Sequence, residues 1–174
     1  NPLVGPVQGL RNFWCACAVM AGFSQGGGVG LALSQWMVNG DPGFDVWAMA
    51  GDGCLMEGIS GEAASLAGHL KLGNLCWIYD NNHITIEGNT RIAFTEDVAA
   101  RFLGYQWNVL RVGDANDLER IEHALTVFRE TKRRPTLIVL DTHIGWGSPH
   151  RQDTAAAHGE PLGADEVRNT RAAL

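Results

Sequence analysis

Lysine is scarce in this sequence, and so is charge in general. Only two of its 13 cationic residues are lysines, and Asp, Glu, Lys and Arg together make up 18% of the 174 residues, with a net charge of −6. The one cationic run, residues 132–134, follows a helical pattern. It is better interpreted as the solvated C-terminal end of a helix than as a nucleic-acid patch. We therefore expect no nucleic-acid partner.

Long apolar runs and paired cysteines are also missing. The longest apolar stretch, residues 13–23, is too short to cross a bilayer, and no charged region of a signal peptide precedes it. Cys15, Cys17, Cys54 and Cys76 show neither C-x-x-C spacing nor the disulfide pattern of a secreted protein. We interpret them as free thiols of a cytoplasmic protein with no membrane partner.

Two signatures of phosphate-binding loops are absent as well. No G-x-x-x-x-G-K-[ST] occurs, and the glycine run at residues 26–30 does not have G-x-G-x-x-G spacing. Residues 1–24 carry a single charge, Arg11, and no clear period, so they form an atypical, unassigned segment. The sequence begins at Asn1 without a methionine and stops at Leu174 inside a helical pattern, so we expect a fragment.

From about Gly28 onward, strand-like apolar runs alternate with helical patterns. This alternation predicts an α/β fold, a parallel sheet with helices on both faces. The expected strands are residues 44–50, 75–79, 107–112 and 136–140. The expected helices are residues 28–38, residues 58–70, one from an N-cap at Thr95 to Gly104, and one capped by Asp114. An apolar stripe runs along the last helix, formed by Leu118, Ile121, Leu125 and Phe128.

An acid between two glycines ends the first expected strand, and an asparagine pair ends the second. Because one helix separates these strands, a right-handed connection brings Asp52 and Asn82 to the same edge of the sheet. Carboxylate, amide and backbone carbonyl oxygens suit Mg²⁺ or Ca²⁺, and Mg²⁺ usually shares its shell with phosphate. The glycines would let a phosphorylated ligand reach the backbone. Each motif alone is better explained as a turn, but the two together favour a site.

The segment GDGCLMEGISGEAASLAGHLKLGNLCWIYDNNHITIEG, residues 51–88, resembles the thiamin diphosphate motif of transketolases. The similarity continues through THIGWGSP and AAAHGEPLGADEV, and covers roughly residues 28–174. The GDG…NN frame marks thiamin enzymes broadly, whereas EGISGEAASLAGHLKLGNL and HGEPLG are more specific to transketolase and dihydroxyacetone synthase. The resemblance implies a thiamin diphosphate-binding fold, with residues 25–174 forming an incomplete pyrophosphate-binding domain.

The resemblance also implies roles for single residues. Asp52, Asn82 and the backbone carbonyl of Ile84 would bind Mg²⁺ or Ca²⁺. The residues that would contact thiamin diphosphate are Gly53, Asn82, Ile84, Ile86, Ile144 and His158. His158 would also face the substrate, and Glu57 and Glu62 would join a network at a dimer interface that links two active sites.

Each role has a simpler alternative. Glu57 and Glu62 are also favourable charges near the start of a helix. The three isoleucines are also suited to a core. The other histidines, His69, His83, His123, His143 and His150, are interpreted as structural or surface residues.

One departure from the family concerns its first cofactor loop, roughly GPLGQG. Here GFSQGGGVGLAL keeps Gln25 and Gly26 but replaces the proline-leucine pair. We therefore expect altered or foreign sequence before about Ser24.

The function implied by the resemblance is transfer of a two-carbon ketol unit between sugar phosphates. The chain would be inactive without a pyrimidine-binding domain or subunit, and it would assemble as a homodimer or heteromer. The alternatives are another thiamin enzyme, such as dihydroxyacetone synthase, or a non-catalytic binding module.

Overall fold

The computed structural model describes residues 3–6, 14–17 and 45–174, and the chain divides into two compact units, residues 1–45 and 46–174. In the first unit, β1 (Leu3–Pro6) and β2 (Trp14–Cys17) pair antiparallel. The helix expected at residues 28–38 lies outside the described residues.

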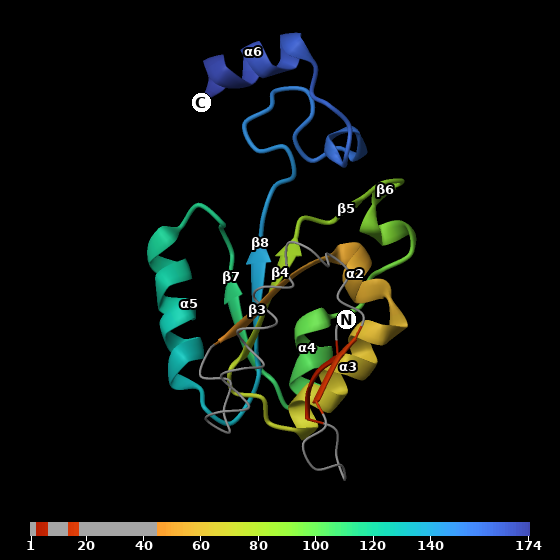
Figure 1. Ribbon diagram of the computed structural model, residues 1–174. Coiled ribbons are helices and arrows are strands. Elements are labelled where there is room, and N and C mark those ends of the chain that lie inside the picture. The colour runs from red at the N-terminus through yellow and green to blue at the C-terminus, as the bar shows by residue number, and fades with distance from the viewer. Residues whose placement is uncertain (1–2, 7–13, 18–44) are drawn as a thin grey trace. The chain divides into compact units, whose positions relative to one another are not determined.

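The second unit is built on a four-stranded parallel sheet (Figure 1). Its strand order is β3 (Val46–Gly51), β4 (Leu75–Asn81), β8 (Thr136–Asp141) and β7 (Asn108–Val112). Each strand lies within two residues of its expected bounds, and the parallel sheet predicted from the sequence is confirmed. The register places Gly51 opposite Asp80 and Asn81 opposite Asp141, so the ends of three strands meet at one edge.

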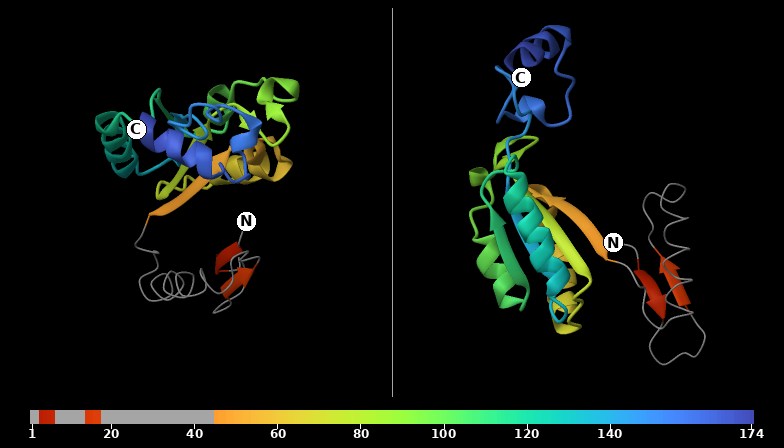
Figure 2. Two further views of the ribbon diagram at one scale, coloured as in Figure 1. Left: turned by 90° about the horizontal axis from the view of Figure 1, so that it is seen from above. Right: turned by 90° about the vertical axis from the view of Figure 1, so that its left-hand side faces the viewer.

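Helices cover both faces of this sheet, as Figures 1 and 2 show. On one face lie α2 (Asp52–Met56), α3 (Gly58–His69) and α4 (Val98–Gly104), and on the other lies α5 (Leu118–Glu130). The chain runs across the sheet from β3 to β7 and then turns back to β8. Right-handed crossovers therefore require the last connecting helix to lie on the opposite face.

A tightly packed cluster fills the face of the sheet covered by α3 and α4. Its buried residues are Leu55, Ala64, Ala67, Tyr79, Val98, Phe102, Trp107, Leu137 and Val139. Close approach at α3 depends on Gly68, because a Cβ there would lie 1.9 Å from the carbonyl oxygen of Tyr105. The small residues of α3 therefore let the helix lie directly against the chain that enters β7.

The α5 face has a smaller cluster, formed by Cys76, Val112, Ala124, Phe128 and Ile138. Neighbouring residues of β8 alternate between the two clusters, as expected for a strand buried on both faces. The apolar stripe predicted on α5 is correct for Phe128, Ile121 and Leu125, which are buried or pack against the cluster. It is wrong at Leu118, which is 75% exposed because it is the first residue of the helix.

The N-caps of two helices differ from those predicted. Asp97, not Thr95, caps α4, and its side chain accepts a hydrogen bond from the Ala100 N–H at 3.0 Å. Asp117, not Asp114, caps α5 by accepting from the Arg120 N–H at 3.1 Å. Asp114 accepts from the Asn116 N–H instead, so its oxygen closes a turn before the helix begins.

The remaining elements are short. A hairpin of β5 (Ile84–Thr85) and β6 (Gly88–Asn89) follows β4, and the 3-10 helix η1 (Thr90–Ile92) follows the hairpin. The 3-10 helix η2 (Ala155–Ala157) and α6 (Ala164–Ala173) come after β8. Among the residues that the structure describes, no helix is long and apolar enough to cross a membrane.

Candidate functional site

Asp52 lies at the carboxyl end of β3 and is only 3% exposed. The Tyr79 hydroxyl donates to its Oδ1 at 2.6 Å, and the His83 N–H donates to its Oδ2 at 3.0 Å. Burial, and then the hydrogen bond and charge of Asp52, raise the pKa of the Tyr79 phenol far above its usual value. The structure therefore brings Asp52 to the backbone that directly follows Asn82, as the sequence predicts.

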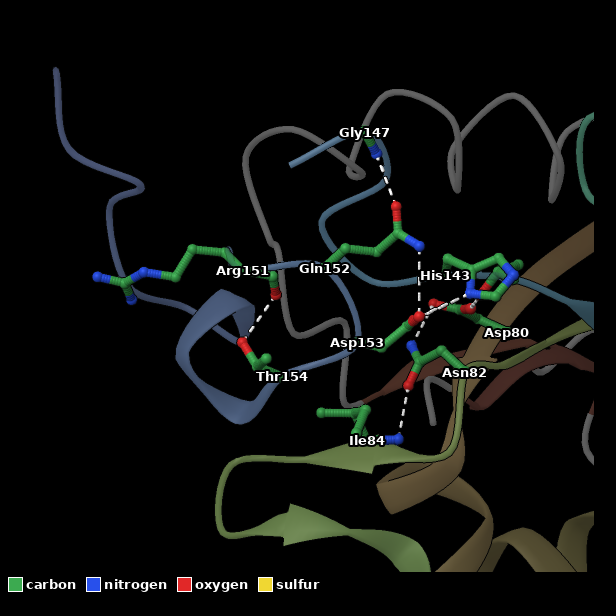
Figure 3. A network of polar contacts seen from close by, with 10 residues as sticks. Asp80, Asn82, Ile84, His143, Gly147, Arg151, Gln152, Asp153 and Thr154 are labelled. Atoms are coloured by element: carbon green, nitrogen blue, oxygen red, sulfur yellow. Dashed lines mark hydrogen bonds and ion pairs between the residues drawn. The ribbon is translucent and has the colours of Figure 1, made fainter. Parts of the chain in front are cut away.

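Asn82 is held by its own neighbours (Figure 3). Its Nδ2 donates to Asp80 Oδ2 at 3.2 Å, and its Oδ1 accepts from the Ile84 N–H at 2.9 Å. Asp80 in turn accepts a short hydrogen bond from the Thr142 hydroxyl. These contacts orient the Asn82 amide, with its nitrogen toward Asp80 and its oxygen toward the Ile84 N–H. The oxygen is the atom of this side chain that can bind a cation.

The third strand of this edge contributes residues that sequence reasoning missed. Asp141, at the end of β8, accepts from Asn81 Nδ2 at 2.6 Å and forms an ion pair with Arg111 at 3.1 Å. Thr142 follows it and binds Asp80. The sequence did contain a signal for this residue, because Asp141 directly follows the fourth expected strand. Parallel strands end at the same edge of a sheet, so an acid at that position is expected near the other strand ends.

Oxygens at this edge retain unused acceptor capacity. A carboxylate can accept about four hydrogen bonds, and the two described donors to Asp52 occupy half of that number. Asp52 also lines a cavity of about 360 Å³, together with Asn81, His83 and Arg91. A Cβ added at Gly51 or Gly53 meets nothing within 4 Å, so internal packing does not require glycine at either position.

The donor set fits a hard divalent cation bound together with a phosphate. Within the described residues, no group of three or more His, Cys, Asp or Glu side chains could hold a metal ion. A cation at Asp52 would therefore complete its shell with amide, carbonyl and phosphate oxygens. Mg²⁺ and Ca²⁺ accept such shells, whereas a structural zinc site needs sulfur or imidazole ligands.

Comparison with known proteins decides the family. Residues 22–174 match the family described as Transketolase, thiamine diphosphate binding domain. The chain belongs to this family. The transketolase of Nostoc sp. is 53% identical over 126 residues, which are 72% of this chain and 19% of that protein. The transketolase of Geobacillus stearothermophilus is 46% identical over 154 residues, covering 83% and 23%.

Solved transketolase structures share the fold. The Pichia stipitis enzyme, crystallised with sedoheptulose-7-phosphate, has a TM-score of 0.74 at 44% identity and matches 83% of this chain. The Campylobacter jejuni transketolase has a TM-score of 0.71 at 38% identity and matches 74% of it. These matches cover 23% and 20% of the solved chains, so the present chain spans about a fifth of the length of its transketolase relatives.

The other residues expected to act in a transketolase site are mostly exposed. Gly53, Glu57, Glu62 and His158 are exposed, and Ile86 is 69% exposed. Within residues 45–174, no hydrogen bond or ion pair joins the side chains of Glu57, Glu62 or His158 to the strand-end residues. Asp52 thus contacts the backbone of His83, between Asn82 and Ile84, whereas neither glutamate nor His158 has such a contact within the described residues.

The isoleucines differ from one another in their surroundings. Ile84 is buried at 9% exposure, which also agrees with a role in the core. Ile144 is half-buried, and its carbonyl accepts from the Asp153 N–H. Ile86 has an apolar side chain in solvent, so a core role does not explain it.

Three of the histidines predicted to be structural or surface residues take part in defined contacts. His83 has a positive φ of 61° and donates its N–H to Asp52. His143 Nδ1 lies 3.0 Å from Asp153, and His150 Nδ1 lies 2.9 Å from Glu166. Figure 3 shows the His143–Asp153 pair, with Asp153 also bound to Gln152. At His83, the backbone N–H is the group that contacts Asp52.

Glu166 ties α6 to the loop after β8. Its carboxylate accepts from the Ser148 hydroxyl, the His150 N–H and the His150 ring. The Ser148 hydrogen bond, followed by those from His150, lowers the pKa of Glu166 to about 2. Because the pKa of Glu166 is lowered in the folded chain, its ionised carboxylate stabilises the contact between α6 and the loop at pH values above the ordinary pKa of glutamate. This stabilisation is lost as the pH falls toward 2.

Glu166→Gln is therefore expected to loosen α6 at neutral pH but not at low pH. Hydrogen exchange of the α6 amides, compared between wild type and variant from pH 7 to pH 2, measures the effect. We expect faster exchange in the variant above about pH 4.5 and convergence of the two proteins near pH 2. Glu160→Gln, which changes an exposed acid in the same segment, serves as the control. A difference that persists unchanged to pH 2 contradicts the prediction.

Proposed function

We propose that this chain forms the diphosphate- and metal-binding part of a cytoplasmic transketolase, which transfers a two-carbon ketol unit between sugar phosphates. One observation carries the proposal: the buried Asp52 carboxylate is bonded to the backbone beside Asn82, within a chain that matches the thiamine diphosphate-binding domain of transketolases. The solved Pichia stipitis transketolase with sedoheptulose-7-phosphate supports a sugar-phosphate substrate.

In this proposal, Asp52, Asn82 and the Ile84 carbonyl hold Mg²⁺ or Ca²⁺, and the exposed backbone at Gly53 faces the diphosphate. Open space beside Gly53 supports this role. Ile86 and Ile144 present apolar surface to the cofactor rings. When bound, thiamin diphosphate supplies the nucleophilic carbon and the electron sink that ketol transfer needs. His158 orients oxygens of the substrate and exchanges protons with them.

Glu57 and Glu62 serve another subunit in this proposal. Both side chains are exposed, and neither has an ion pair within the described residues. Glu57 occupies the N-cap position of α3, where a negative charge is favourable without any partner. Glu62 is the fifth residue of α3, beyond the first turn, so the same explanation does not cover it. We infer that these acids contact a second copy or a partner subunit.

Ketol transfer further requires a pyrimidine-binding domain. Within the family, that domain contributes the glutamate that activates the cofactor, and this chain corresponds to only about a fifth of its relatives. We therefore expect the 174 residues alone to bind the cofactor but not to turn over substrate.

Calorimetric titration of the chain with thiamin diphosphate, with and without Mg²⁺, tests this proposal. We expect binding that depends on the metal, negligible turnover of xylulose 5-phosphate with ribose 5-phosphate, and turnover after a transketolase pyrimidine-binding domain is added. Robust turnover by the chain alone contradicts the need for a partner domain. Absence of metal-dependent binding contradicts the site.

Binding without turnover in the presence of the partner favours a non-catalytic module, and preference for formaldehyde as acceptor favours a dihydroxyacetone synthase.

A further inference from the structure

Tyr79 is a buried polar side chain that has no role in the site as proposed so far. It lies on β4, opposite Ala50 of β3, and is 3% exposed. Its ring belongs to the core cluster under α3 and α4, whereas its hydroxyl donates to Asp52 Oδ1 at 2.6 Å. A phenylalanine would fill the same space in the core, so packing alone does not explain the hydroxyl.

The hydroxyl has a defined effect on the carboxylate. One donor binds each oxygen of Asp52: the Tyr79 hydroxyl binds Oδ1, and the His83 N–H binds Oδ2. Two donors on different oxygens restrain both the position of the carboxyl group and its rotation. Neither donor is itself mobile, because one belongs to a packed aromatic ring and the other to the backbone. The oxygens therefore keep a fixed orientation at the cavity that Asp52 and Tyr79 both line.

We propose that Tyr79 is a positioning residue of the metal site, whose hydroxyl holds the Asp52 carboxylate in the orientation that binds the divalent cation. The inference rests on the proposed function, since it assumes a cation at Asp52. Removing a side chain that hydrogen-bonds to a metal ligand commonly lowers the metal affinity about 10- to 100-fold. A buried ligand with one donor lost would have to reorganise each time the metal binds.

Tyr79→Phe tests the inference because it removes one hydroxyl and keeps the ring. Mn²⁺, observed by electron paramagnetic resonance in the presence of thiamin diphosphate, reports metal binding to the full 174-residue chain. We expect the variant to bind Mn²⁺ at least about 10-fold more weakly than wild type. Tyr105→Phe is the matched control, since it removes a hydroxyl that lies beside Gly61 of α3. Its Mn²⁺ affinity should equal that of wild type.

Thermal unfolding separates positioning from a general structural role. Metal that binds only the folded chain raises its unfolding temperature, and the rise depends on affinity. If Tyr79 positions Asp52, the variant shows a smaller rise with Mn²⁺ than wild type at equal concentration. If the hydroxyl only stabilises the fold, the unfolding temperature in EDTA falls while the rise with Mn²⁺ and the Mn²⁺ affinity are unchanged, and the inference is wrong.

The same titration separates this inference from the proposed function. No Mn²⁺ binding by the wild-type chain contradicts the metal site itself, and the inference fails with it. Binding by wild type with equal or tighter binding by Tyr79→Phe leaves the metal site standing and overturns only the role of Tyr79.

Discussion

Asp52→Asn is expected to abolish the metal-dependent binding of thiamin diphosphate. The substitution keeps the shape of the side chain but removes its negative charge, which in the proposed site is the one charged protein ligand of the cation. We expect Mg²⁺ affinity to fall by more than about 100-fold, beyond the loss caused by removing a hydrogen-bond partner of a ligand. Calorimetric titration with thiamin diphosphate and Mg²⁺ measures the change.

The folded chain should accept asparagine at this position. The amide oxygen can accept from the His83 N–H, while the amide nitrogen donates to the Tyr79 oxygen once the hydroxyl hydrogen rotates away. In addition, a buried negative charge is costly, and Asp52 is only 3% exposed. The unfolding temperature measured in EDTA should therefore not fall in the variant. Lost binding without lost stability would identify Asp52 as a residue kept for function.

Asp114→Asn is the matched control for this experiment. Asp114 also follows a strand of the same sheet, but it is exposed and its side chain closes a turn with Asn116. We expect unchanged affinity for Mg²⁺ and thiamin diphosphate in this variant. Equal binding by Asp52→Asn and wild type would show that the cation, if bound, is held elsewhere.

Part of the site was predictable because it follows from the order of elements. Asp52 and Asn82 each end an apolar run, and parallel strands joined by a helical crossover must end at the same edge. The same reasoning applied to the fourth strand would have added Asp141 and Thr142. Sequence was sufficient wherever position along a strand determined which residues meet.

Other contacts depended on choices that the sequence leaves open. Thr95 and Asp97 are both able to cap α4, and two acids three residues apart are both able to cap α5. In each case the loop geometry selected the later residue. The bond from Tyr79 to Asp52 joins residues 27 positions apart and depends on the depth of the ring in the core. Its existence follows from tertiary packing, which local patterns do not encode.

Trp107→Ala is expected to cause a large loss of stability in the described fold. Trp107 is fully buried and packs edge to face on Phe102 and at a tilt on Trp77, with both ring centroids 5.0 Å away. Its indole N–H donates to the Ala64 carbonyl of α3 at 2.8 Å. Removing this side chain empties the centre of the cluster that joins α3 and α4 to the sheet. We expect the free energy of unfolding to fall by about 3–5 kcal/mol.

Urea unfolding followed by circular dichroism measures this change without relying on tryptophan fluorescence. Trp107→Phe keeps an aromatic ring but loses the hydrogen bond to α3, so we expect an intermediate loss of about 1–2 kcal/mol. Trp146→Ala is the control, because Trp146 is 51% exposed and contacts His143 after β8. This variant should lower the free energy of unfolding by less than about 1 kcal/mol.

Since Tyr79 belongs to the same cluster as Trp107, Mn²⁺ binding should disappear at the urea concentration at which this cluster unfolds. A Trp107→Ala variant as stable as Trp146→Ala would show that the cluster does not hold α3 and the strand ends together.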